Sequence, residues 1–156
     1  MLPERLDALS VSDLFALRSE IESELGRRGL SAKVGELGEW FAIEHFARTP
    51  GLPSLAAAPR GAKNIDAISK DGDRYSIKTI QKGGKTGTIY PSYVDGIEKV
   101  LFEYIVVVLL DEDFSLLSMY RLSWEQFVVV RSWDTRMSAY YLGRSKRVFS
   151  VAERVG

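Results

Sequence analysis

An acidic and a basic side chain stand on either side of a turn signal in the middle of the chain. Asp66 precedes the pair Asp71–Gly72, and Ser76 and Lys78 follow it. Asp-Gly between two alternating runs is a strong hairpin signal, so we expect two antiparallel strands here. Strand side chains alternate between faces, so Ser76 and Lys78 share one face, and the hairpin brings Asp66 across from them.

A carboxylate beside an ammonium group on one sheet face suits metal-dependent cleavage of phosphodiester bonds. The carboxylate of Asp66 would bind a hard divalent cation, which lowers the pKa of its bound water. The ammonium of Lys78 would orient that water or offset the charge that builds on the phosphate. The backbone carbonyl of Ile77 is available as a further ligand.

Helices are expected on the N-terminal side of this hairpin. Ser10 and Asp13 have the spacing of an N-cap and its capping-box partner, and leucine and isoleucine then recur at helical spacing until Gly29. A second helix is expected over 34–47. Its buried stripe is expected to be Val34, Leu37, Phe41 and His45, the last as a partly buried helix residue rather than a catalytic base.

The remaining elements alternate between strands and helices. We expect strands at 64–69, 74–81, 104–110 and 115–121, a short helix at 91–102 and a helix that begins at Ser123. The sequence therefore predicts an α/β (α+β) fold, a mixed central sheet flanked by helices with an extra N-terminal helix. Its 156 residues suit one domain: a helix in 1–30, a core in 34–121, and a C-terminal helix with a basic aromatic tail in 122–156.

The order and spacing of these residues resemble the PD-(D/E)XK nuclease superfamily, in which an Asp is followed on the next strand by acid-X-Lys. Residues 35–42, Gly-Glu-Leu-Gly-Glu-Trp-Phe-Ala, are similar to the Gly-x-x-Gly-Glu-x-x-Ala helix of several of its groups, and the chain also looks like a group of uncharacterised bacterial domains within it. The resemblance covers roughly 14–127. It implies a restriction endonuclease-like fold and a nuclease dependent on Mg²⁺ (or Mn²⁺), with Asp66 and Glu39 as metal carboxylates and Lys78 as catalytic lysine.

Ser76 departs from this pattern, because it stands where the superfamily has Asp or Glu. A serine can hydrogen-bond a metal-bound water but adds no charge, and Glu36, Glu39 or Gln81 would have to compensate. Two other functions therefore stay open: a catalytically inactive nucleic-acid-binding or scaffold domain, and a protein-interaction module whose acidic N-terminal helix docks a partner. In those cases Asp66 would bond loop amides and Lys78 would be a solvated edge-strand lysine.

Basic residues gather in two segments although the net charge is zero, with 21 basic and 21 acidic residues. Residues 60–85 hold seven Lys or Arg against three Asp, and residues 131–147 hold five against one. Such segments suit a groove for a polyanion, although solvated basic loops explain them as well. The nucleic-acid-binding residues expected in and beside them are Gln81, Lys82, Lys85, Arg144, Lys146 and Arg147. DNA is favoured over RNA as partner, and a homodimer is possible.

Several classes of function are excluded by composition. The chain has no Cys and a single His, so disulfide scaffolds, thiol nucleophiles and multi-His metal sites are ruled out. The run Gly83-Gly-Lys-Thr86 lacks the earlier glycine of a phosphate-binding P-loop. No secretory leader and no apolar run of the ~20 residues that span a bilayer are seen, so a cytoplasmic protein without a membrane partner is expected.

Overall fold

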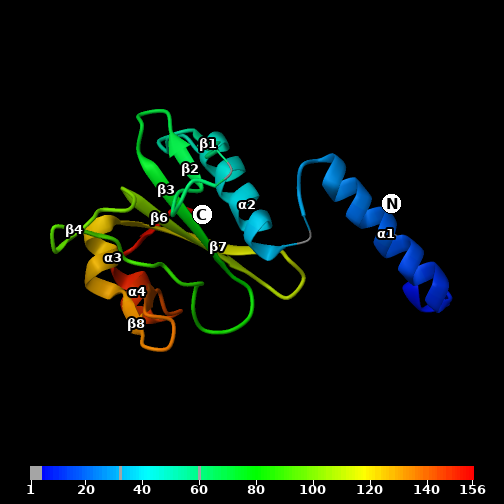
Figure 1. Ribbon diagram of the computed structural model, residues 1–156. Helices are drawn as coiled ribbons and strands as arrows, with labels where there is room; N and C mark the ends of the chain where they lie inside the picture. The colour runs from blue at the N-terminus through cyan, green and yellow to red at the C-terminus, as the bar shows by residue number, and fades with distance from the viewer. Residues whose placement is uncertain (1–4, 32, 60) are drawn as a thin grey trace. The chain divides into compact units, whose positions relative to one another are not determined.

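The hairpin centred on Asp71–Gly72 belongs to a six-stranded mixed sheet (Figure 1). The computed structural model describes residues 5–31, 33–59 and 61–156. The strand order is β1-β2-β3-β6-β7-β10, and every neighbouring pair is antiparallel except β3 and β6. The strands are β1 (Leu55–Ala57), β2 (Ala67–Ser69), β3 (Arg74–Ile80), β6 (Tyr104–Leu110), β7 (Leu116–Ser123) and β10 (Glu153–Arg154). The expected mixed sheet flanked by helices is confirmed.

The connection from β3 to the parallel strand β6 contains a second hairpin, so the helix expected over 91–102 is wrong. The hairpin joins β4 (Tyr93–Val94) to β5 (Ile97–Glu98). Its turn residues Asp95 and Gly96 have φ of 53° and 78°. Two successive positive φ angles are typical of the Asp-Gly turn that connects antiparallel strands, and this local preference explains why a hairpin forms here instead of a helix.

One face of the sheet is covered by α2 (Val34–Arg48) through small residues. The buried residues of α2 are Gly38, Ala42 and Phe46, not the expected Val34, Leu37 and Phe41. A Cβ at Gly38 would lie 1.7 Å from Oγ1 of Thr79, so the helix backbone approaches β3 directly. The rings of Phe46 and Tyr75 meet edge to face, with centroids 5.7 Å apart. Thr79 and Tyr75 therefore point toward α2.

The opposite face of the sheet carries the main hydrophobic core. Ile80 of β3 and Ile105, Val107 and Leu109 of β6 belong to one buried cluster with residues of α3 (Trp124–Val130) and α4 (Lys146–Val151). Facing residues of the parallel pair match this arrangement, since Ile80 lies beside Leu109. This core fixes the orientation of β3, whose even-numbered residues point toward it.

The C-terminal segment adds strands as well as the expected helix. The helix that begins after Ser123 is confirmed as α3, whose N-cap Ser123 forms a capping box with Gln126. The rest of 122–156 forms β8 (Ser132–Asp134), β9 (Ala139–Tyr141), α4 and β10, and β10 pairs with β7 at the edge of the sheet.

The chain divides into two compact units, residues 1–37 and 38–156. In the first unit, η1 (Leu6–Ala8) precedes α1 (Val11–Arg27), which begins with the expected capping box of Ser10 and Asp13. The single domain expected over 1–156 stays a prediction. None of the helices in the described residues is long and apolar enough to cross a membrane.

Candidate functional site

The hairpin holds Asp66 directly before β2, and Asp66 lies beside β3. The N–H of Asp66 donates to the Tyr75 carbonyl at 2.8 Å, and Asp66 Oδ2 accepts from the Ile77 N–H at 2.7 Å. The carboxylate thus continues the ladder between the strands beyond the last paired residues. Its second oxygen, Oδ1, accepts no hydrogen bond from any residue that the structure describes. Asp66 is therefore both a ladder partner and a positioned carboxylate with one oxygen available.

Ser76 and Lys78 lie on one face of the sheet, as alternation along β3 predicts. Ala67 pairs with Tyr75, and the Asp66 N–H donates to the carbonyl of the same Tyr75, so Asp66 lies beside β3 without a regular partner there. That Asp66 shares the face of Ser76 and Lys78 stays a prediction. Thr79 points toward Gly38 of α2. Because side chains alternate along β3, Ser76 and Lys78 point to the opposite face of the sheet. Ser76 is buried, with 2% of its surface exposed, whereas Lys78 is half-buried.

The carbonyl of Ile77 is expected at the same edge of β3 as the Asp66 carboxylate. The N–H and C=O of a strand residue point to the same neighbour, and the Ile77 N–H points at Asp66. Strand β2 begins at Ala67, so it does not extend alongside Ile77. The Asp66 carboxylate and the Ile77 carbonyl, two hard oxygen donors, are therefore both expected at the edge of β3, next to the start of β2.

Two further carboxylates, Glu39 and Glu36, lie on α2. Glu39 is half-buried on α2 and follows Gly38, the residue that packs on Thr79. It belongs to the helix that covers the face opposite Lys78. Glu36, in the first unit, accepts a hydrogen bond from the Ser31 N–H at 2.5 Å. Within the described residues, no group of three or more Asp, Glu, His or Cys could hold a metal ion.

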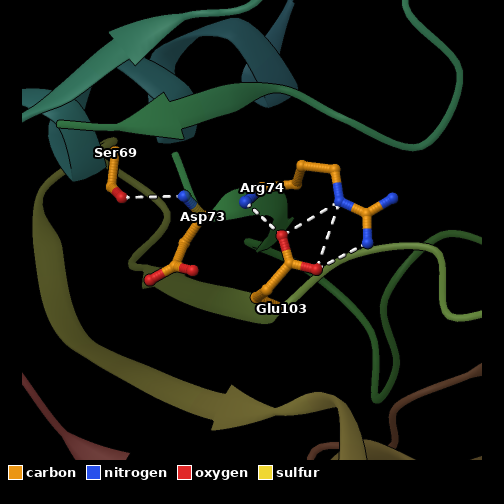
Figure 2. A network of polar contacts seen from close by, with 4 residues as sticks. All are labelled: Ser69, Asp73, Arg74 and Glu103. Carbon is orange, nitrogen blue, oxygen red and sulfur yellow. Dashed lines mark hydrogen bonds and ion pairs between the residues drawn. The ribbon is translucent and has the colours of Figure 1, made fainter. Parts of the chain in front are cut away.

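The start of β3 is fixed by an ion pair on the same face as Ser76. Figure 2 shows Glu103 accepting hydrogen bonds from the backbone and the guanidinium of Arg74, at 2.5–3.2 Å. These bonds lower the pKa of Glu103 below its ordinary value, chiefly through the Arg74 guanidinium. In the neighbouring turn, the Asp73 N–H donates to Ser69 Oγ at 3.1 Å. Both contacts hold the hairpin that carries Asp66 and Lys78.

The two basic segments lie side by side along a short bridge. The Arg144 N–H donates to the Gly84 carbonyl at 2.6 Å, and Thr86 exchanges hydrogen bonds with Leu142 at 2.9 and 3.1 Å. Lys82 and Lys146 are exposed on either side of this bridge. The sequence predicted both segments but not that they would be paired. Arg60, counted in the first of them, lies outside the described residues.

The six residues expected to bind nucleic acid differ in how far they are engaged within the protein. Gln81 donates to the Asp111 carbonyl at 3.2 Å, and Lys85 pairs with Asp134 at 3.3 Å. Arg147 donates to the carbonyls of Val129 and Val130 at the end of α3. The cations whose side chains make neither an ion pair nor a hydrogen bond to a described residue are Lys82, Arg144 and Lys146. These three are the exposed charges that this surface offers to a polyanion.

His45 has a local structural role. Its ring Nε2 contacts the Val155 carbonyl and Thr49 Oγ1. The residue is half-buried on α2, as expected for a partly buried helix residue.

A cavity that the sequence did not indicate lies beside the hairpin. It has a volume of about 550 Å³, and its walls are residues 63–65, Arg74, 90–92 and 99–101. No motif pointed to it, because its walls come from segments that are far apart in the sequence. The clues present were the cations Lys63 and Lys99 and the aromatic Tyr90.

Comparison of the chain with models of known protein families gives no match, and comparison with curated protein sequences gives none either.

Proposed function

We propose that this protein is a metal-dependent nuclease that hydrolyses phosphodiester bonds in DNA, on a restriction endonuclease-like core. The observation that carries the proposal is the position of Asp66. Its carboxylate is held by the Ile77 amide and keeps one oxygen available, next to the strand that carries Ser76 and Lys78. A fixed carboxylate can bind a divalent cation, and a lysine nearby can offset charge that develops on a phosphate, so these groups suit metal-assisted phosphodiester hydrolysis.

The oxygen donors at this edge fit Mg²⁺ or Mn²⁺. Asp66 Oδ1 and the Ile77 carbonyl would hold the ion, and Glu39 enters as second carboxylate through the superfamily resemblance. Mg²⁺ commonly takes one or two protein carboxylates and completes its shell with waters and phosphate oxygens, so a small protein ligand set is sufficient. When bound, such an ion supplies a water of lowered pKa next to the phosphate.

The side chains of this chain then have separate roles. Asp66 is a ligand whose direction is set by the Ile77 amide. Lys78 donates a hydrogen bond to the attacking water or to the phosphate oxygen that gains charge. Ser76, buried beneath them, hydrogen-bonds a ligand water without adding charge. The cations Lys82, Arg144 and Lys146 contact the DNA backbone.

A cleavage assay with matched substitutions tests the proposal. Supercoiled plasmid and labelled oligonucleotides would be incubated with Mg²⁺, Mn²⁺ or EDTA. Asp66→Asn keeps an acceptor for the Ile77 amide, and Lys78→Met keeps the length of the side chain. We expect each to reduce the rate by about 100-fold or more, as for loss of a metal ligand or a proton-handling group.

The controls come from the turn of the same hairpin. Asp71→Asn and Lys70→Met change the same residue types at exposed positions and should leave the rate unchanged. Far-ultraviolet circular dichroism and the melting temperature would verify folding of every variant. Metal-independent cleavage, or equal rates in Asp66→Asn and Asp71→Asn, would contradict the proposal.

A catalytically inactive nucleic-acid-binding domain is the second candidate, and the burial of Ser76 favours it. With 2% of its surface exposed, Ser76 cannot be replaced by a carboxylate without desolvating that charge, and the site has one acidic group fewer than the superfamily pattern. DNA binding in EDTA without cleavage under any metal would support this candidate. A protein-interaction module predicts no salt-sensitive affinity for nucleic acid.

The remaining expectations belong to the same proposal. DNA is preferred over RNA by analogy with the superfamily, and RNA substrates in the same assay test that preference. A homodimer, a cytoplasmic setting and the absence of a membrane partner stay predictions.

A further inference from the structure

The cavity beside the hairpin lies at the first residue of β3 and at the segment that leads into Asp66. Arg74, in its wall, is an even-numbered residue of β3, as are Ser76 and Lys78. Residues 63–65, which form another wall, lead directly into Asp66. A ligand in this cavity would therefore lie next to a phosphate bound at Asp66.

The walls combine positive charge, an aromatic ring and amide groups. Lys63 and Lys99 are exposed and make no ion pair with a described residue. The guanidinium of Arg74 is instead paired with Glu103, so Arg74 forms part of the cavity wall and offers no unpaired charge to a ligand. Tyr90 is 51% exposed, so one side of its ring is open to a ligand.

The cavity is held open by backbone contacts rather than by the ligand groups themselves. The Lys99 N–H donates to the Ser92 carbonyl at 2.7 Å, which closes the base of the β4–β5 hairpin. Asn64 has φ of 60°, a left-handed conformation that asparagine tolerates better than most residues. The Glu103 N–H donates to the Arg74 carbonyl at 3.0 Å. Lys63, Lys99 and Tyr90 are thus attached to a preformed frame.

We propose that this cavity receives one unpaired nucleotide of the DNA strand that the protein cleaves, so that the substrate class is single-stranded DNA or the unpaired part of a duplex. The proposal rests on the proposed nuclease function. Tyr90 stacks on the base, Lys63 and Lys99 hold the flanking phosphates, and Asn64 hydrogen-bonds the edge of the base.

An unpaired nucleotide fits better than duplex DNA for two physical reasons. In a duplex both faces of each base are covered by its neighbours, so a ring offered for stacking needs a base outside the stack. The volume of about 550 Å³ lies in the range of pockets that enclose one small ligand, whereas an intact duplex would contact only the rim.

Binding measured in EDTA tests this inference without cleavage. Fluorescence anisotropy would follow a labelled single strand, the corresponding blunt duplex and a single-stranded RNA of the same sequence. Wild type should bind the single DNA strand more tightly than the duplex. Tyr90→Ala should weaken single-strand binding by about tenfold and leave duplex binding unchanged.

The lysine pair is tested through the salt dependence. The Lys63→Ala, Lys99→Ala double variant should lower the slope of log affinity against log salt for single-stranded DNA by about 1.4, since each neutralised phosphate contributes about 0.7. Tyr93→Ala and Lys70→Ala are matched controls, because both residues are exposed and lie outside the cavity wall. Equal effects of Tyr90→Ala and Tyr93→Ala, or tighter binding of the duplex or of RNA, would overturn the proposal.

The two proposals fail in different ways. Cleavage that needs Asp66 but is insensitive to Tyr90, Lys63 and Lys99 would overturn the nucleotide cavity and keep the nuclease. Single-strand binding that depends on Tyr90, without cleavage under any metal, would keep the cavity and overturn catalysis. Absence of nucleic-acid binding would overturn both.

Discussion

Two helices of this protein start with the same sequence signal and are stabilised in different ways. Ser10 and Asp13 cap α1, and Ser123 and Gln126 cap α3, each as a capping box with both hydrogen bonds formed. The 17 residues of α1 are all described and none is buried, whereas the 7-residue α3 buries Phe127 and Val130.

The difference shows which forces remain when a helix has no buried face. In α1 the contacts within the helix are exposed ion pairs, such as Arg18 with Glu22 at 3.1 Å and Arg27 with Glu24 at 2.6 Å. Such exposed pairs contribute little to stability, because water and salt screen them. In α3 the ring of Phe127 packs against Phe102. A capping box therefore marks where a helix begins, while burial decides how strongly it is held.

The largest expected effect is on the buried helix. Phe127→Ala should lower the free energy of unfolding by about 3–5 kcal/mol, because it removes a fully buried ring and leaves a cavity. Phe15→Ala in α1 is the matched control, with 63% of Phe15 exposed, and should change the stability by less than about 0.5 kcal/mol. Urea unfolding followed by circular dichroism measures both, and similar losses would contradict the comparison.

Glycine-to-alanine substitutions should have opposite signs in the two units. Nothing lies within 4 Å of a Cβ at Gly26 in α1, so Gly26→Ala should raise helix stability by up to about 1 kcal/mol. A Cβ at Gly38 would overlap Thr79, so Gly38→Ala should cost about 1–3 kcal/mol.

A double variant isolates the steric cause at Gly38. Oγ1 of Thr79 is buried without a hydrogen-bond partner, so Thr79→Ala removes the closest obstacle at little cost and leaves the Thr79 Cβ 2.9 Å from the added Cβ. Gly38→Ala combined with Thr79→Ala should recover part of the melting temperature lost by Gly38→Ala alone. No recovery would mean that the backbone, not Thr79, excludes the side chain.

The two capping serines offer a smaller and more direct comparison. Ser123→Ala should lower the unfolding free energy of the 38–156 unit by about 1 kcal/mol, since α3 is part of its core. Ser10→Ala removes the same kind of cap but should only increase amide hydrogen exchange within α1. A shift of the main unfolding midpoint by Ser10→Ala would show that α1 is coupled to the rest.

Local signals in the sequence predicted the elements that depend on local contacts. The capping box of Ser10 and Asp13, the helix start at Ser123, the Asp71–Gly72 turn and the buried strand β6 were predicted from a few neighbouring residues, and all are confirmed. The helix expected at 91–102 is wrong although the signal at Asp95–Gly96 was equally local. There Pro91 favoured the first turn of a helix, and the turn signal at Asp95–Gly96 was not used.

Elements that depend on distant partners could not be predicted in this way. Strand β10 exists because Glu153 pairs with Arg121 of β7. The buried stripe of α2 was predicted from large apolar residues, but close approach to β3 needs small ones, hence Gly38 and Ala42. The buried residues of α2 could have been predicted correctly only by knowing which strand the helix packs against.

For the candidate site, the register was predictable and the environment was not. Alternation along β3 set Ser76 and Lys78 on one face, and the hairpin brought Asp66 beside that strand, where it bonds Tyr75 and Ile77. The burial of Ser76, the side of the sheet that α2 covers, and the cavity near Lys63 and Lys99 all depend on how distant segments pack.

The smallest expected effect is electrostatic and confined to the exposed helix. Glu24 accepts hydrogen bonds from Arg27 and Arg28, which lower its pKa from 4.5 to about 2. A lowered pKa in the folded state stabilises the helix above the unfolded value and loses that effect as pH falls from about 4.5 through about 2. The end of α1 should therefore fray progressively in this range, and more salt should weaken the effect because the side chains are exposed.

Chemical shifts of the backbone of residues 24–29, followed by nuclear magnetic resonance between pH 6 and pH 2, would measure this fraying. Glu24→Gln should remove most of its pH dependence, because the neutral amide cannot pair with either arginine. Glu20→Gln is the control, since Glu20 makes no ion pair with a described residue. Because α1 lacks buried residues, the unfolding midpoint of the 38–156 unit should not respond to either change. A response there would mean that α1 and the core are not as different as their burial indicates.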